Sequence, residues 1–347
     1  MEIPSAAVGY LYSHIFSPIA SAIGSSTQVS VLSIILALIV FSIALAISIT
    51  LYVYLFGWGE RKIMGRIHSR HGPTYVGKFG MLQNMADVLK LLSKEHISPD
   101  NADKPLFFLL LPITYALFFL IFAFLPFNST TFGVGGSLGL IAVFAILSLA
   151  PMLMFLIGWT SGNKFGSISA QRSVMVMLAY EIPMLLVVAS VAMLSGSYSL
   201  LSIVNSQSGM WYGILMPIGL FVFFVVMLAE VERPPFDMSE ADNELIAGWL
   251  TDVSAPYYTI ALFLDYTRMF FGTMIISLLF LGGWAGPAFL PPTFWLLAKV
   301  AILTVFIILI RVSMVRMKIG RILRAGWIYL MPLAVINMLV TFVLFIG

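Results

Sequence analysis

Acidic side chains are concentrated in one short part of this 347-residue sequence. Seven of its 15 Asp and Glu residues lie between positions 230 and 252, where Arg233 is the only basic residue: Glu230, Glu232, Asp237, Glu240, Asp242, Glu244 and Asp252. Like charges this close together favour the protonated form of some members, which can then exchange protons near neutral pH. The stretch predicts proton handling.

Helix capping is the alternative interpretation of these acids. The prolines at 234–235 end the preceding helix, because proline lacks an amide hydrogen. Ser239 then fits an N-cap, with Asp242 at the capping-box spacing and Glu240 in the first turn. Capping does not explain the two glutamates at the foot of the preceding apolar stretch, so both interpretations stay open.

Glu181 lies near the middle of an apolar stretch at 170–195. An acid inside a membrane span costs about 2.5–3.5 kcal/mol on insertion scales and usually marks a pathway. Pro183 removes the hydrogen bond to the Ala179 carbonyl, which leaves a polar group beside this acid. We expect Glu181 to face the bundle interior, either in a proton path or as a structural partner of a neighbouring helix.

Three further ionisable residues fall inside apolar stretches. Asp265 and Arg268 are three residues apart, which predicts a local ion pair on one helix. Lys299 is the only charged residue of its stretch and is expected either to extend towards the membrane surface or to neutralise a buried acid.

The composition identifies the elements that must position these residues. Hydrophobic residues make up 61% of the chain and charged residues only 10%, against about 25% charged in soluble domains. Helices that cross a membrane need about 20 apolar residues each. Eight such stretches are present, at roughly 29–57, 105–127, 136–159, 170–195, 210–231, 257–283, 294–314 and 326–346. We therefore predict an all-α integral membrane protein, with residues 1–347 as a single domain of eight transmembrane helices.

The basic residues predict the orientation in the membrane. Every Lys and Arg except Arg268 and Lys299 lies in or beside four segments on one side of the predicted bundle, namely 58–104, 160–169, 232–256 and 315–325. The segments between spans on the other side contain neither residue type. The positive-inside rule places the basic segments in the cytoplasm and both chain termini outside.

Segment 58–104 is long for a connection between neighbouring spans. Residues 79–93 have a helical pattern with apolar and polar faces, which predicts an amphipathic helix at the bilayer surface or under a partner protein. His68 and His71 lack companions suited to a metal site, so none is predicted. The chain has no cysteine, which excludes an iron–sulfur cluster bound by its thiolates.

Several motifs resemble the H subunit of NADH:quinone oxidoreductase, known as subunit 1 of mitochondrial complex I. The resemblance extends in order from about residue 30 to 345. It rests on Glu60-Arg61-Lys62, Gly72-Pro73, Ala86-Asp87, Ala102-Asp103-Lys104, Gly158-Trp159-Thr160-Ser161, Tyr180-Glu181, Arg233-Pro234-Pro235-Phe236-Asp237, Glu240-Ala241-Asp242 and Leu281-Gly282-Gly283-Trp284. Thr74-Tyr75 departs from the Asn-Arg usual in this family after Gly-Pro.

This resemblance implies a function that topology alone does not give. Family members anchor a hydrophilic redox arm, form much of a quinone chamber, and adjoin antiporter-like membrane subunits; the iron–sulfur clusters belong to partner subunits. Segments 58–104 and 232–256 would form the chamber and docking surface. The implied chamber residues are Glu60, Arg61, Arg66, Phe236 and Asp237, and the implied proton-coupling residues are Glu181 and the acids of 230–252 other than Asp237.

Two alternatives remain at this stage. The first is the equivalent membrane anchor of an energy-converting hydrogenase or ferredoxin-linked complex, which needs no quinone. The second is a free-standing ion transporter, although the sequence has no visible internal repeat. No nucleic-acid partner is expected; the predicted surroundings are the lipid bilayer and other subunits.

Overall fold

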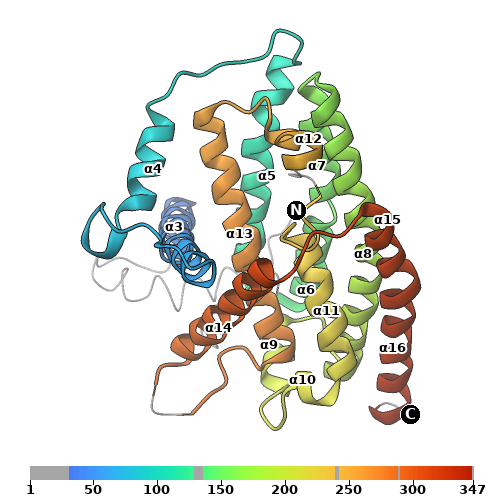
Figure 1. The fold of residues 1–347 in the computed structure, drawn as a ribbon. Coiled ribbons are helices and arrows are strands. Elements are labelled where there is room, and N and C mark those ends of the chain that lie inside the picture. The colour runs from blue at the N-terminus through green and yellow to red at the C-terminus, as the bar shows by residue number, and fades with distance from the viewer. Residues whose placement is uncertain (1–30, 129–135, 239–241, 288–289, 346–347) are drawn as a thin grey trace, which may run out of the picture.

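The structure is a computed structural model that describes residues 31–128, 136–238, 242–287 and 290–345. All regular elements in these ranges are helical, which confirms the predicted all-α class. Most of the long helices pack into a bundle, with α3 and α4 at one edge and α16 at the opposite edge (Figure 1).

Seven helical segments in the described ranges are long and apolar enough to cross a membrane. They are Ile39–Ile67, Lys104–Phe124, Gly136–Thr160, Lys164–Ser195, Ala255–Phe280, Pro292–Ser313 and Ile319–Leu344. The predicted span at 210–231 is divided into α10 (Tyr212–Leu215) and α11 (Pro217–Glu230), because Pro217 has no amide hydrogen and Met216 leaves the helical conformation. The count of eight transmembrane helices therefore stays a prediction.

The long helices are α3 (Val31–Ile67), α5 (Lys104–Phe124), α8 (Lys164–Ser195), α13 (Ala255–Phe280) and α14 (Pro292–Ser313). Another span consists of η3 (Gly136–Leu138), α6 (Gly139–Leu147) and α7 (Ala150–Thr160), and its break precedes Pro151. The last span joins α15 (Ile319–Arg324), the π-helical η5 (Ala325–Leu330) and α16 (Met331–Phe345). The short elements are η2 (Lys78–Gly80), α4 (Gln83–Leu92), α9 (Leu200–Ser206), α12 (Asp242–Leu245) and η4 (Gly248–Leu250).

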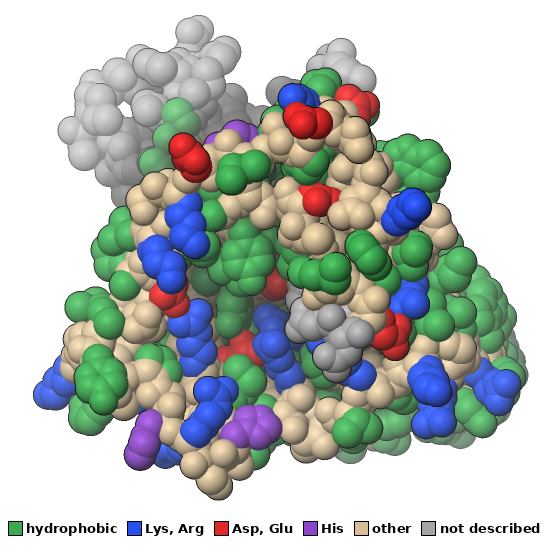
Figure 2. Space-filling view, turned by 45° about the horizontal axis from the view of Figure 1, so that its top comes forward, with side chains coloured by type: hydrophobic (Ala, Val, Ile, Leu, Met, Phe, Trp, Pro, Cys, Tyr) green, Lys and Arg blue, Asp and Glu red, His purple; other side chains and the backbone are tan. Residues whose placement is uncertain are grey.

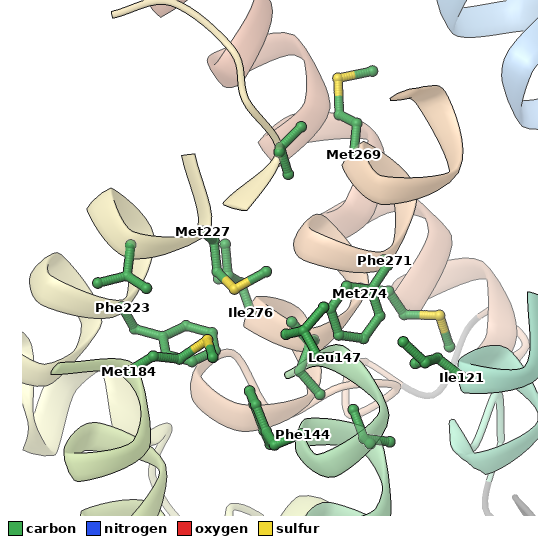
Figure 3. Packing of buried hydrophobic residues seen from close by; sticks show 14 of the residues in the cluster. Ile121, Phe144, Leu147, Met184, Phe223, Met227, Met269, Phe271, Met274 and Ile276 are labelled. Carbon is green, nitrogen blue, oxygen red and sulfur yellow. The ribbon is translucent and has the colours of Figure 1, made fainter. Parts of the chain in front are cut away.

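Two helices organise the bundle. Helix α8 packs against α7, α11 and α16, and α13 packs against α3, α5, α11 and α14. Figure 3 shows the apolar core, in which Met184 and Phe223 meet near Met227, with Phe271 and Met274 of α13 alongside. Since lipid is as apolar as these side chains, close packing rather than transfer from water is what stabilises such helix contacts.

The predicted amphipathic helix is present as α4 but is shorter than 79–93. Phe79 and Gly80 have positive φ angles of 58° and 72°, so the chain cannot be helical until after them. The polar side faces the bundle, where Asn84 donates to the Tyr54 carbonyl at 3.1 Å. Met85, Leu89 and Leu92 are exposed, so the apolar side points away from the rest of the chain.

Candidate functional site

A buried carboxylate of α3 is the centre of the first group of charges. Glu60 is 1% exposed and accepts a hydrogen bond from the Tyr266 hydroxyl of α13 at 2.9 Å. It forms ion pairs with Arg311 of α14 and, at 3.5 Å, with Arg233. The Arg233 guanidinium also lies 5.3 Å from the centre of the Tyr266 ring. One carboxylate thus connects α3, α13, α14 and the loop after α11.

That loop, residues 231–238, directs two neighbouring charges to different partners. While Arg233 pairs with Glu60, Glu232 accepts hydrogen bonds from Arg268 at 3.1 Å and from the Ser173 hydroxyl at 2.5 Å. Glu232 has a φ of 53°, a left-handed conformation that costs a residue with a side chain about 1–2 kcal/mol. The charge-assisted contacts of Glu232 offset this cost.

Glu230 ends α11 just before this ion pair. It is 7% exposed, and its Oε1 atom has no hydrogen-bond partner in the described part of the chain. The charges of Arg268, Glu232 and Glu181 all act on it, so these groups form one electrostatic unit. Glu181 itself is half-buried on α8. The structure therefore brings Glu181, Glu230 and Glu232 together, as the sequence predicts.

The backbone beside Glu181 has the irregularity that Pro183 predicts. The Ala179 carbonyl lies against Gly326 of the π-helical turn η5, where a Cβ atom would come within 3.0 Å of it. Tyr180 donates its hydroxyl hydrogen to the Ile322 carbonyl at 3.0 Å. Helix α8 is thus fastened to the last span next to Glu181, and π-helical turns are frequent at functional positions.

Phe236 and Asp237 lie on the same loop and are both buried, at 5% and 6% exposed. The Phe236 ring contacts the Tyr180 ring edge-to-face, with centres 5.2 Å apart. Asp237 accepts a hydrogen bond from Arg316 at 2.8 Å, and its other oxygen has no partner among the described residues. These contacts connect the loop to α8 and to the segment after α14.

The remaining predicted acids lie further out. Glu244 of α12 is exposed and pairs with Arg172 of α8 at 2.6 Å, and Asp252 has one buried oxygen without a partner in the described ranges. Asp242 begins α12, but its side chain lies outside the described part, as do Ser239 and Glu240. The capping interpretation therefore stays a prediction.

The three predicted α3 residues point in three directions. Glu60 faces the bundle, whereas Arg61 pairs with Asp87 of α4 at 2.5 Å. Burial raises the pKa of Asp87, but hydrogen bonds from Arg61 and Gln83 and the Arg61 charge outweigh it, so the pKa is lowered overall. Arg66 lines an open cavity of about 470 Å³ together with Trp58, Lys62, Arg70, His71 and Phe79. This division follows from the 3.6-residue helical turn.

Two expectations about charges inside the spans are wrong. Asp265 and Arg268 do not pair; Arg268 instead bonds to Glu232, since a buried charge-assisted bond outweighs a weak contact three residues away on one helix. Lys299 does not pair with any acid of the described residues. Its ammonium donates to the carbonyls of Leu281, Gly283 and Ala285 at 2.6, 2.9 and 2.8 Å.

The sequence identifies the acids of this site but not their partners. Arg311 and Arg316 bear only on orientation in the sequence, and nothing there singles out Tyr266 or Ser173. A weak signal for the arginines is present, because basic residues follow the span at 294–314. No group of three or more His, Asp or Glu in the described ranges is arranged to hold a metal ion.

Comparison with known proteins gives one consistent result. Residues 30–342 match the family described as NADH dehydrogenase. The chain is 37% identical over 289 residues to the NADH-quinone oxidoreductase H subunit of Dehalococcoides mccartyi strain CBDB1, covering 83% of this chain and 81% of that protein. It is 38% identical over 286 residues to the protein of the same name from Geobacillus sp. strain WCH70, covering 81% and 86%.

Proposed function

Since this chain belongs to the family of the NADH-quinone oxidoreductase H subunit, a membrane subunit of complex I, we propose that it anchors the hydrophilic redox arm of such a complex and couples quinone reduction to proton translocation. Electrons would stop at an iron–sulfur cluster in a partner subunit. The antiporter-like membrane subunits would receive the resulting signal. This chain would supply the chamber and the acids, and no redox centre.

The observation that carries this proposal is the arrangement of buried acids and guanidinium groups around the loop 231–238. Glu60, Glu230 and Glu232 lie between transmembrane helices, and two of the three are held by arginines. Reduction and protonation of a quinone nearby would change the local charge. Because the protein interior screens charges less than water does, neighbouring acids would respond by shifting protons or by moving the arginines.

The proposed quinone chamber comprises Glu60, Arg61, Arg66, Phe236 and Asp237. Phe236 offers an apolar contact surface, and Asp237 has a buried oxygen that can accept a further hydrogen bond. Arg66 lines the open cavity at the end of α3, which would place it at the mouth of the chamber. Glu60 would hold Arg233 and Arg311 in place behind that mouth.

A variant of Glu230 tests the coupling role in the assembled complex. In membrane vesicles, Glu230→Gln is expected to assemble normally but to lose most quinone-linked proton uptake, because the amide cannot exchange a proton. Glu244→Gln is a matched control, since that carboxylate is exposed and paired at the surface. Full proton translocation and quinone reduction by the Glu230→Gln complex would refute the assignment.

The proposed orientation places segments 58–104 and 232–256 in the cytoplasm and both termini outside. The absence of cysteine makes this directly measurable, because any introduced thiol is the only one in the chain. Ser93 and Ser208 are both exposed and lie on opposite sides of the predicted bundle. In right-side-out vesicles, an impermeant maleimide should label Ser208→Cys and leave Ser93→Cys unlabelled. The reverse pattern would invert the topology.

A further inference from the structure

The open cavity at the end of α3 carries a strong positive charge. Its lining includes the basic side chains of Lys62, Arg66, Arg70 and His71, and contains no Asp or Glu. The other walls are apolar, formed by Trp58, Ile63 and Phe79. Figure 2 shows Lys and Arg side chains gathered beside His side chains over the lower part of one face.

These basic groups are not neutralised within the described part of the chain. Neither Lys62, Arg66 nor Arg70 forms an ion pair with a carboxylate there, whereas the adjacent Arg61 does so with Asp87. Lys62 instead lies 5.9 Å from the centre of the Trp58 ring. Guanidinium and ammonium groups converging on one hollow are the usual recognition chemistry for a phosphate group.

The surface of α3 below the cavity is apolar and open. Leu51 and Leu55 are 55% and 47% exposed. At about 100° per residue, Leu51, Leu55, Lys62 and Arg66 lie within about 60° of one another around the helix. One face of α3 therefore passes from exposed leucines to basic residues.

The spacing along α3 suits a membrane interface. From Leu55 to Lys62 the helix rises by about 10 Å. The polar region of a bilayer is about 5–8 Å thick on each side of its hydrocarbon core. With Leu51 and Leu55 among acyl chains, the amino and guanidinium groups of Lys62 and Arg66 reach the level of the lipid phosphates.

We propose that this face of α3 binds one anionic phospholipid, with the phosphate in the cavity between Lys62, Arg66 and Arg70 and the acyl chains along Leu51 and Leu55. A soluble phosphate ester would use the cavity but not the leucines. The binding site lies on the outer side of α3, opposite Glu60, so the inference does not depend on proton coupling by the buried acids.

The test uses the assembled complex in nanodiscs of phosphatidylcholine with phosphatidylglycerol. Lipids that remain bound after exchange into detergent are counted by mass spectrometry. In Lys62→Gln/Arg66→Gln/Arg70→Gln, the affinity for phosphatidylglycerol should fall at least about tenfold, since each charge-assisted contact accounts for about that factor or more. Phosphatidylcholine retention should not change.

Two further variants separate the proposal from general effects. Lys318→Gln/Arg321→Gln/Arg324→Gln removes the same charge from another exposed basic segment and should retain the lipid. Leu51→Ser/Leu55→Ser should weaken phosphatidylglycerol binding while leaving the basic groups intact. Assembly of each complex, checked on native gels, distinguishes lipid loss from misfolding, and Lys62→Arg should bind normally.

Three results would overturn the proposal. Equal phosphatidylglycerol retention in the wild type and the triple variant would show that the charges serve another purpose, such as contact with a neighbouring protein of the complex. Displacement of the lipid by inorganic phosphate at millimolar concentration would make the cavity a site for a soluble anion. Displacement by a short-chain quinone would assign it to the quinone chamber.

Discussion

The ion pair between Arg268 and Glu232 gives the sharpest prediction about the stability of the bundle. The two side chains are 1% and 11% exposed, and Arg268 also lies 5.1 Å from the centre of the Phe118 ring. Replacing Arg268 with Met fills most of its volume but leaves Glu232 charged and nearly buried. Removal of one partner of such a pair costs about 3–5 kcal/mol.

A second, exposed pair in the same protein provides the comparison. Arg172 and Glu244 lie 2.6 Å apart but are 25% and 56% exposed. Water screens their attraction, and pairs of this kind contribute about 0–1 kcal/mol. Arg172→Met should therefore lower the free energy of unfolding by about 1 kcal/mol or less.

The double variant separates the ion pair from the packing. In Arg268→Met/Glu232→Met no charge is left without a partner, and two apolar side chains can fill the site. Replacing a buried ion pair in this way is often neutral or stabilising by about 1–4 kcal/mol. We expect the double variant to unfold with a free energy at or above that of the wild type.

The measurement is unfolding of the purified chain by SDS in mixed micelles, followed by tryptophan fluorescence. The expected order of stability is the double variant and wild type, then Arg172→Met, and last Arg268→Met. Equal losses in Arg268→Met and Arg172→Met would refute the view that burial determines the strength of these pairs. A double variant as unstable as the single one would show that Arg268 acts through packing.

Three more outcomes follow from the contacts. Glu181→Gln should impair proton translocation in the assembled complex without preventing assembly, and unchanged pumping would count against its role. Because the pKa of Asp87 is lowered, its stabilising contribution is complete above the unfolded value of about 3.9 and disappears as pH falls through the lower folded value. The hydrogen-exchange difference between wild type and Asp87→Asn in α4 should thus be constant from about pH 7 to 5 and vanish at more acidic pH. Lys299→Met should speed amide exchange at 281–285, with partial rescue by added methylammonium, since its ammonium bonds to three carbonyls there.

Most of the fold could be predicted because apolar length is a direct signal. Seven of the eight predicted spans are helices long enough to cross a membrane. The exception contains Pro217, and a window of hydrophobicity does not register that one proline divides the stretch into α10 and α11. Helix α4 begins late for a related reason, since the positive φ of Phe79 is set by the packing of its loop and not by residue type.

The candidate site was predictable only in part, because sequence spacing identifies acids but not their partners. Glu60 pairs with Arg233 and Arg311, which are far away along the chain. Arg268 illustrates the opposite error, where a nearby acid on the same helix suggested a pair that a more distant carboxylate forms instead. Lys299 bonds to backbone carbonyls, a class of partner that side-chain patterns cannot indicate.

The loop 231–238 joins the two halves of this charge network, because consecutive residues face opposite ways. Glu232 bonds to Arg268 of α13, and Arg233 pairs with Glu60 of α3. The charges of Arg233 and Arg268 both act on Asp265, which lies between them on the network. A shift of this loop would therefore change both ion pairs at once, and neither arginine can move without exposing a buried carboxylate. If quinone chemistry is transmitted through this chain, the rigid coupling of Glu232 to Arg233 by one peptide bond is the shortest physical link between the chamber side and the acids of α8 and α11.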